Sequence, residues 1–195
     1  MPYLIYRSRL KGQVEQLRKE YFHPALSQLE GTVLELGVNS GINLPAYSPE
    51  TRVIGIDKKV TQGQSNHVDG PIRCSFDPIE GTTENLPFSD STFDAVTGSF
   101  VLCCANSLER TVEEIYRVLK PRGKLILLEH IRSRRLRTQV LQYFITVGQT
   151  LAQSDCKLTR DPRSILHQTG FVTKEEIVLD NPIEPYLFIE LMKPK

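Results

Sequence analysis

Short apolar runs alternate with longer amphipathic stretches along most of this 195-residue chain. Residues 33–36 and 53–56 are rich in Val, Ile and Leu, which is typical of strands buried on both faces of a parallel sheet. Further strands are predicted within 72–80, over 93–99, and from 125 to 130, and the spacing at the end of the chain predicts a two-stranded hairpin over 171–179 and 186–192. The pattern therefore predicts an α/β fold.

Helices are predicted between several of these strands. Residues 5–22 have apolar side chains at helical spacing, up to an interruption at Pro24. A second helix is predicted over 106–120, ended by Pro121 and Gly123, and a short one over 162–169 after Asp161 as N-cap. The stretch from Asn43 allows only a short helix with Pro45 near its start, and residues 58–71 have almost no apolar side chains, so we expect a loop there.

The stretch from Arg132 to Leu151 has two interpretations. Four arginines within six positions precede a predicted helix with an apolar face, namely Arg132, Arg134, Arg135 and Arg137. One interpretation is an interfacial helix that makes a weak contact with a membrane surface or with an anionic, lipid-like substrate. The other is a solvated basic turn followed by a helix that packs in the core.

Composition and charge narrow the function classes only a little. A net charge of +1 gives no argument for nucleic acid as a partner, and no apolar stretch approaches the ~20 residues that span a bilayer. The first ten residues lack a signal-peptide core. The four cysteines have no metal-site spacing, so we expect reduced thiols in a cytoplasmic protein. The oligomeric state stays open.

The candidate chemistry lies where the first two strands end. Gly37, Asn39 and Gly41 follow the first apolar run, and glycine lets the backbone turn tightly and a ligand approach it closely. Asp57 ends the second run, about 20 residues after the first glycine, where an acid accepts hydrogen bonds from ribose hydroxyls. The N–H groups of the short helix that follows Asn43 are placed to receive a carboxylate. A nucleoside-containing cofactor is therefore expected at these strand ends.

The pattern of Glu35, Gly37 and Gly41 resembles the first motif of class I S-adenosylmethionine-dependent methyltransferases. Asn39 stands where that motif has its middle glycine, and asparagine visits left-handed backbone conformations more readily than most residues. Leu-Pro-Phe at 86–88, Lys-Pro-Arg-Gly at 120–123 and the order of the predicted elements extend the resemblance from about residue 20 to residue 193. Leu-Glu-His at 128–130 and Cys-Lys-Leu-Thr-Arg at 156–160 are similar to the ubiquinone/menaquinone-biosynthesis type and its thiol and small-molecule branch.

The resemblance implies a fold and an activity. The fold is a Rossmann-like, doubly wound, seven-stranded sheet, mostly parallel, with an antiparallel C-terminal strand pair. One domain over 1–195 would hold a helical lid at 1–30 on an α/β core at 31–195, although a helix packed on the sheet face is an equal alternative. The activity is direct methyl transfer from S-adenosylmethionine to a small-molecule thiol, hydroxyl or amine.

The resemblance also implies roles for individual residues. Gly37 and Gly41 would admit the cofactor, Glu35 would orient its amino-acid end, Asp57 would hold the ribose, Thr83 and Glu84 would border the adenine, and Phe100 would flank the methyl group. His130 is the candidate base or acceptor-orienting residue. Its alternative is a histidine that hydrogen-bonds locally and only shapes the pocket.

Two other function classes remain open from the sequence. An NAD-type oxidoreductase would need a third glycine where Ile42 stands, and the terminal hairpin also disfavours it. A methyltransferase-fold protein with weakened or lost catalysis, acting as a binding or partner subunit, is compatible with Asn39, with Thr82 and with the depleted stretch after Asp57.

Overall fold

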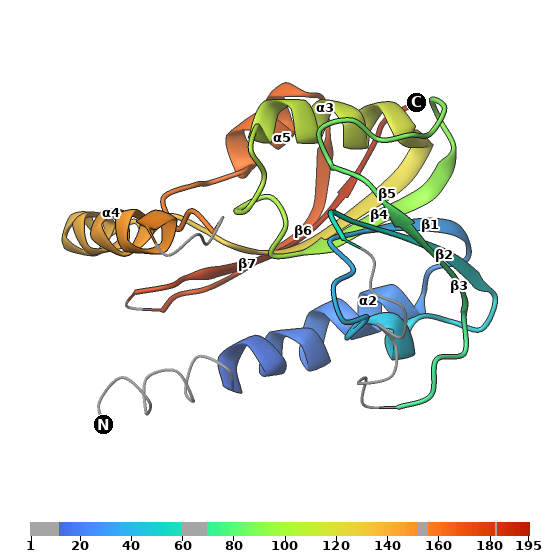
Figure 1. The fold of residues 1–195 in the computed structure, drawn as a ribbon, viewed down its shortest axis with the longest axis horizontal. Coiled ribbons are helices and arrows are strands. Elements are labelled where there is room, and N and C mark those ends of the chain that lie inside the picture. The colour runs from blue at the N-terminus through green and yellow to red at the C-terminus, as the bar shows by residue number, and fades with distance from the viewer. Residues whose placement is uncertain (1–11, 60–69, 152–155, 182) are drawn as a thin grey trace.

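A seven-stranded sheet forms the centre of the molecule (Figure 1). The computed structural model describes residues 12–59, 70–151, 156–181 and 183–195. The strands are β1 (Gly31–Leu36), β2 (Thr51–Asp57), β3 (Ser75–Glu80), β4 (Phe93–Ser99), β5 (Leu119–His130), β6 (Val172–Leu179) and β7 (Tyr186–Met192). Their order is β3-β2-β1-β4-β5-β7-β6. Strands β1 to β5 pair in parallel, and β7 is antiparallel to both β5 and β6. The predicted fold class is confirmed.

Helices cover both faces of the sheet (Figure 1). On one face, α3 (Leu108–Val118) and α5 (Arg163–Gln168) contribute to a core cluster with the apolar residues of β1, β4 and β5. On the other face, the N-terminal helical region packs on a second cluster that includes Val33, Ile126 and Phe188. Each fully buried Val, Leu, Ile or Phe contributes about 1.5–3 kcal/mol relative to an exposed one, so the two clusters fix the sheet between its helical layers.

The N-terminal helical region continues through Pro24, where the sequence predicts a break. Residues 12–17 are helical, followed by the π-helical segment η1 (Arg18–Phe22) and by α2 (His23–Ser27). Pro24 lies in the first turn of α2, where its missing N–H breaks no bond of that helix. Phe22 is fully buried, and the ring of Tyr21 lies 5.8 Å from that of Phe188 on β7. This region therefore packs on the sheet face, and residues 5–11 of the predicted helix lie outside the described residues.

Pro121 and Gly123, where the sequence predicts the end of the helix over 106–120, lie instead in the irregular beginning of β5. Helix α3 is shorter than predicted: the Ser107 hydroxyl caps its start, and it ends at Val118. Pairing with β4 then begins at Leu119 and shifts register before Lys124. Arg122 has a positive φ of 66° and its N–H donates to Lys193 O at 2.8 Å, so contact with the end of β7 holds this stretch in the sheet.

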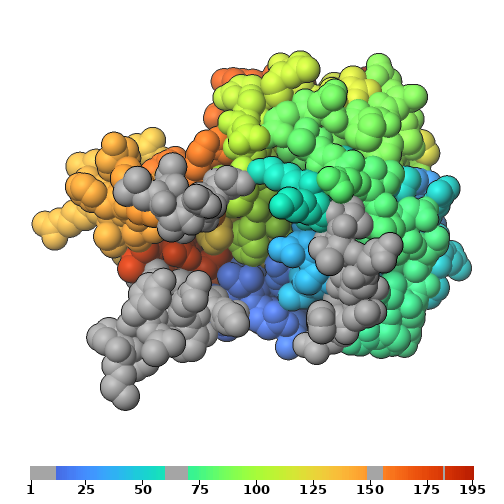
Figure 2. All heavy atoms as spheres, in the orientation of Figure 1, coloured from blue at the N-terminus to red at the C-terminus, as the bar shows by residue number. Residues whose placement is uncertain are grey.

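Helix α4 (Leu136–Leu151) does not pack in the core, so that interpretation of the sequence is wrong. Leu136 is 75% exposed and Phe144 is 65% exposed, whereas the polar Gln142 is fully buried. The Gln142 side chain accepts a hydrogen bond from Ser133 N and donates one to Ile131 O, which anchors α4 through its polar face. The helix stands away from the body of the protein (Figures 1 and 2).

The remaining short elements agree with the sequence. The 3-10 helix η2 (Leu44–Ala46) is the short helix expected around Pro45. Strand β3 is an edge strand, as its Pro78 requires, because proline cannot donate a hydrogen bond to a second neighbour. Most of the loop predicted over 58–71 lies outside the described residues. No helix in the described part of the chain is long and apolar enough to cross a membrane.

Candidate functional site

A cavity of about 560 Å³ opens at the carboxyl ends of β1, β2 and β4. This is the edge at which ligands bind in open α/β sheets, and the volume lies within the ~300–1,000 Å³ typical of small-molecule sites. Seven of the predicted site residues line it: Gly37, Asn39, Asn43, Asp57, Thr83, Glu84 and Phe100. Glu35, Gly41 and His130 are not among its lining residues.

The loop after β1 forms one wall of the cavity. Gly37 has a φ of 62°, and its N–H donates to Ile56 O at 2.8 Å, which turns the chain back toward β2. Asn39 has a φ of 45°, the left-handed conformation that asparagine tolerates in place of glycine. Its N–H donates to Asp57 Oδ2 at 2.8 Å, so the acid that ends β2 fixes the loop with one carboxylate oxygen and keeps a second.

Glu35 reaches the cavity through Asn43. The Asn43 amide donates to Glu35 Oε1 at 2.7 Å, and Asn43 Oδ1 accepts a hydrogen bond from Arg18. Glu35 is buried, and this burial raises the pKa of its carboxyl to about 7, against the opposing effect of the Asn43 hydrogen bond. Its Oε2 makes no hydrogen bond with any residue that the structure describes. Glu35 therefore positions Asn43 in the cavity wall, rather than lining the wall itself.

The segment between β3 and β4 carries Thr83 and Glu84 to the opposite wall. Glu84 Oε1 accepts a hydrogen bond from Asn106 N at 2.7 Å, and the Thr83 hydroxyl lies 3.2 Å from that of Thr111 on α3. Both contacts tie this segment to the region where α3 begins. They hold the two predicted residues at the cavity.

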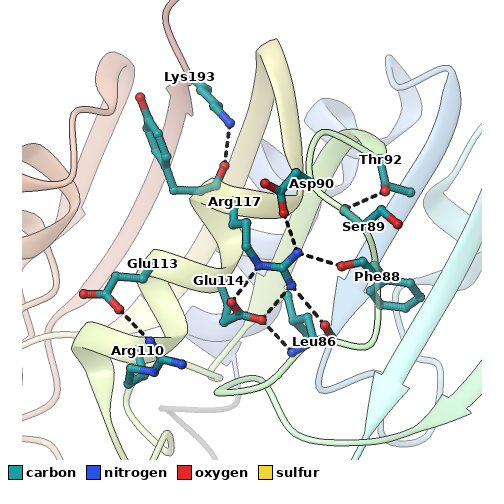
Figure 3. A network of polar contacts seen from close by, with 11 residues as sticks. Leu86, Phe88, Ser89, Asp90, Thr92, Arg110, Glu113, Glu114, Arg117 and Lys193 are labelled. Carbon is teal, nitrogen blue, oxygen red and sulfur yellow. Dashed lines mark hydrogen bonds and ion pairs between the residues drawn. The ribbon is translucent and has the colours of Figure 1, made fainter.

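Arg117 on α3 anchors the same segment further along (Figure 3). Its guanidinium donates to Leu86 O at 3.0 Å and to Phe88 O at 2.7 Å, and it forms an ion pair with Glu114 at 2.8 Å. The Glu114 carboxylate in turn accepts a hydrogen bond from Leu86 N at 2.8 Å. The hydrogen bond from Arg117 lowers the pKa of Glu114, so both groups stay charged at neutral pH.

His130 lies behind Phe100. Phe100 has a φ of 59° and lines the cavity, with its ring centroid 4.5 Å from that of His130. Burial lowers the pKa of His130 to about 4, so the imidazole is neutral at pH 7. Its Nδ1 lies 3.7 Å from the thiol sulfur of Cys103, and its Nε2 lies 3.9 Å from a Glu184 carboxylate oxygen. The role of His130 as a base stays a prediction.

Eleven further residues line the cavity, and five of them have polar side chains that the sequence analysis did not assign to the site: Arg18, Ser40, Lys58, Ser99 and Cys104. Lys58 and Ser99 have a signal in the sequence, because one directly follows the acid that ends β2 and the other ends β4. Arg18 has none, because it comes from a helix whose packing only the tertiary structure reveals. Its guanidinium also donates to Ser99 Oγ at 3.3 Å, which ties the N-terminal region to the end of β4.

The residues present fit an adenosyl sulfonium, the cofactor that the sequence resemblance implies. The cavity has the required size and presents Asp57 beside a turn of left-handed residues. Behind its wall lies a buried carboxyl oxygen without a hydrogen-bond partner among the described residues.

Comparison with known proteins identifies the family. The profile of a family described as "Methyltransferase domain" matches residues 34–127. Demethylmenaquinone methyltransferase of Symbiobacterium thermophilum is 30% identical over 125 residues, which cover 60% of this chain and 50% of that protein. This chain therefore spans about half the length of that relative.

A second relative aligns over far more of the chain. Thiol S-methyltransferase TMT1B of Rattus norvegicus is 30% identical over 186 residues, covering 87% of this chain and 74% of that protein. The crystal structure of the YcgJ protein of Bacillus subtilis superimposes with a TM-score of 0.69 at 17% identity, over 89% of this chain and 97% of that one, which shows the shared fold. The chain belongs to the class I S-adenosylmethionine-dependent methyltransferases, a family whose cofactor is S-adenosylmethionine.

Proposed function

We propose that this protein transfers the methyl group of S-adenosylmethionine to the thiol of a small molecule. The observation that carries the proposal is the similarity to the rat thiol S-methyltransferase, which extends over 87% of this chain. The alternative acceptor, a demethylmenaquinone, rests on a relative that aligns with 60% of the chain. We therefore place the thiol acceptor first.

When bound, S-adenosylmethionine supplies an electrophilic methyl group. The residues of the chain bind the cofactor and orient it toward the acceptor. Asp57 would accept hydrogen bonds from the ribose with the oxygen that Asn39 N–H does not occupy. Asn43, fixed by Glu35 and Arg18, would hold the amino-acid end. Thr83 and Glu84, tied to the region where α3 begins, would border the adenine.

Methyl transfer to a thiol requires the protein mainly to align the sulfur with the methyl group. A free thiol has a pKa near 8.5, so a few per cent is already thiolate at neutral pH. Holding donor and acceptor in line can supply roughly 7–11 kcal/mol of the barrier. The cavity has an apolar wall after the end of β4, formed by Phe100, Val101 and Ala105. Because the His130 imidazole is neutral and packs on Phe100, we assign His130 a positioning role.

A methylation assay tests the proposal. The protein would be incubated with S-adenosylmethionine labelled in its methyl group and, separately, with small thiols, phenols, quinols and amines, and products would be identified by mass spectrometry. We expect labelled thioethers from the thiols and no labelled product from the phenols, quinols or amines. Methylated quinols or amines without thioethers would contradict the thiol acceptor. Cofactor binding without product from any class would instead favour a scaffold that has lost catalysis.

We also propose that α4 contacts an anionic lipid surface. Its apolar residues Leu136, Tyr143 and Phe144 are exposed while its polar Gln142 is buried, and exposed apolar patches mark interaction sites. Arg134 and Arg137 are exposed beside them, and basic residues next to an exposed apolar face suit a membrane interface with negative lipids.

Vesicle sedimentation tests this contact. We expect the protein to sediment with phosphatidylcholine vesicles only when they contain phosphatidylserine, to be released by salt, and to lose binding in the Leu136→Ser/Phe144→Ser variant. The control is Val172→Ser on β6, because Val172 is also an exposed apolar residue. Ile177 on the same strand would not serve, because it packs against a core cluster. Equal sedimentation of wild type and the α4 variant would contradict the proposal.

A further inference from the structure

Three cysteines that are far apart in the sequence meet beside the cavity. Cys103 and Cys104 follow β4, and Cys156 precedes α5. The sulfur of Cys103 lies 3.6 Å from that of Cys104 and 3.7 Å from that of Cys156. All three sulfurs lie within 4.8 Å of one another. Cys104 lines the cavity but Cys103 and Cys156 do not, so contact with the bound cofactor would not account for the cluster.

His130 lies against two of the three sulfurs. Its Nδ1 lies 3.7 Å from the sulfur of Cys103 and 3.7 Å from the sulfur of Cys156. These three atoms therefore form a triangle with equal sides. Zinc binds sulfur at about 2.3 Å and histidine nitrogen at about 2.0–2.1 Å in a tetrahedron, which places neighbouring ligand atoms roughly 3.5–3.8 Å apart. The triangle has the dimensions of one face of such a tetrahedron. The Cys104 sulfur lies 3.6 Å from the Cys103 corner, and no ring nitrogen of His130 lies within 4.8 Å of all three sulfurs.

The backbone around the cluster is fixed by contacts of its own. Glu129 accepts a hydrogen bond from Cys103 N at 3.2 Å, and Cys103 O accepts one from Lys157 N at 2.9 Å. The Arg160 guanidinium donates to Leu102 O at 2.9 Å. The cysteines are thus held close together by the fold, so a zinc ion would meet Cys103, Cys156 and His130 at ligand spacing before it binds.

We propose that Cys103, Cys156 and His130 supply three corners of a tetrahedral zinc site, and that the Cys104 side chain turns to supply the fourth when the ion binds. The set is a Cys₃His donor group, one of the combinations found in structural zinc sites. On binding, each thiol gives its proton to solvent and binds through sulfur, without any change of oxidation state. The ion would tie the segment that follows α4 to Cys104 in the cavity wall. The site is independent of which acceptor the enzyme methylates.

Metal analysis of the full-length protein tests the site. The protein would be purified under reducing conditions, exposed to zinc and dialysed, and its metal content measured by mass spectrometry. We expect one zinc per chain, and cobalt replacing zinc should give the absorption of tetrahedral thiolate coordination. Cys156→Ser should lose both signals. The control is Cys74→Ser, since Cys74 is buried and its thiol donates to Leu44 O, and it should keep both.

The His130→Gln variant separates zinc from adventitious thiol binding. It should lower zinc affinity at least tenfold while circular dichroism shows an unchanged fold. Zinc retained equally by wild type, Cys156→Ser and His130→Gln would overturn the proposal. A metal-free protein with a disulfide between Cys103 and Cys156 after reducing purification would also overturn it, and peptide mapping detects that bond.

Discussion

Glu35→Gln removes a buried carboxyl whose ionisation opposes folding. Burial raises the pKa of Glu35 to about 7 in the folded protein, from an ordinary value of 4.5. Between these two values the folded protein binds more protons than the unfolded chain. The free energy of unfolding must therefore fall as the pH rises from about 4.5 through 7, and it stays lower above that range.

The size of this effect follows from the two pKa values. Their difference, between about 7 and 4.5, corresponds to about 3 kcal/mol at ~1.36 kcal/mol for each pH unit. Glutamine has nearly the same shape and still accepts the Asn43 hydrogen bond, but it does not titrate. The variant should lose this part of the pH dependence and be more stable than wild type at pH 8.

Urea denaturation of both proteins at pH 5 and pH 8 measures the effect. Wild type should lose about 2.5 kcal/mol more than Glu35→Gln between the two pH values, slightly less than the full difference because pH 5 already lies above the unfolded pKa. Glu129, whose pKa burial also raises to about 7, contributes equally to both proteins and cancels in the difference. The exposed Glu50→Gln is the control and should behave as wild type. Parallel pH dependence in Glu35→Gln and wild type would refute the reasoning.

Three further predictions follow from single contacts. Arg117→Ala should cost about 2–3 kcal/mol of unfolding free energy, because it removes the ion-pair partner of Glu114 and the donor to two carbonyl oxygens; urea denaturation measures this, and a loss below about 0.5 kcal/mol would mean that the network does not hold the segment. Gly37→Ala should cost at least about 1–2 kcal/mol, because alanine is strained at a φ of 62° and its Cβ would lie 2.8 Å from Val101 Cγ2; an unchanged melting temperature would contradict it. Phe144→Ser should change stability by less than about 0.5 kcal/mol, because this side chain is 65% exposed; a large loss in denaturation would mean that it packs in the folded protein.

The sequence predicts the sheet well because burial on both faces gives its strands a strong apolar signal. Strands β4 and β7 begin and end at the predicted residues, and the edge position of β3 follows from Pro78. The helices are predicted less well. Local chemistry predicts a helix break at Pro24. The chain instead stays helical there, because the π-helical segment before Pro24 leads directly into α2 and Tyr21 packs on Phe188 of β7.

The site could be predicted where its residues belong to strand ends, and not where tertiary contacts decide. Asp57 and Phe100 follow from the ends of β2 and β4, and both line the cavity. Arg18 reaches it from a helix that the sequence does not place. Cys103 and Cys156 show no metal spacing along the chain, because α3, β5 and α4 separate them and only the fold brings them together.

Calorimetric titration of S-adenosylhomocysteine into wild type and Asp57→Ala tests the central claim, that the cavity beside Asp57 binds the adenosyl cofactor. Wild type should bind one equivalent, and the variant should lose about 1.5–3 kcal/mol of binding free energy, the range for hydrogen bonds to a charged group, or roughly 10- to 150-fold in affinity. Asp77→Ala is the control, because Asp77 pairs with Arg52 on the sheet edge away from the cavity, and it should bind as wild type. Equal affinity of Asp57→Ala and wild type, or no binding by wild type, would contradict the account.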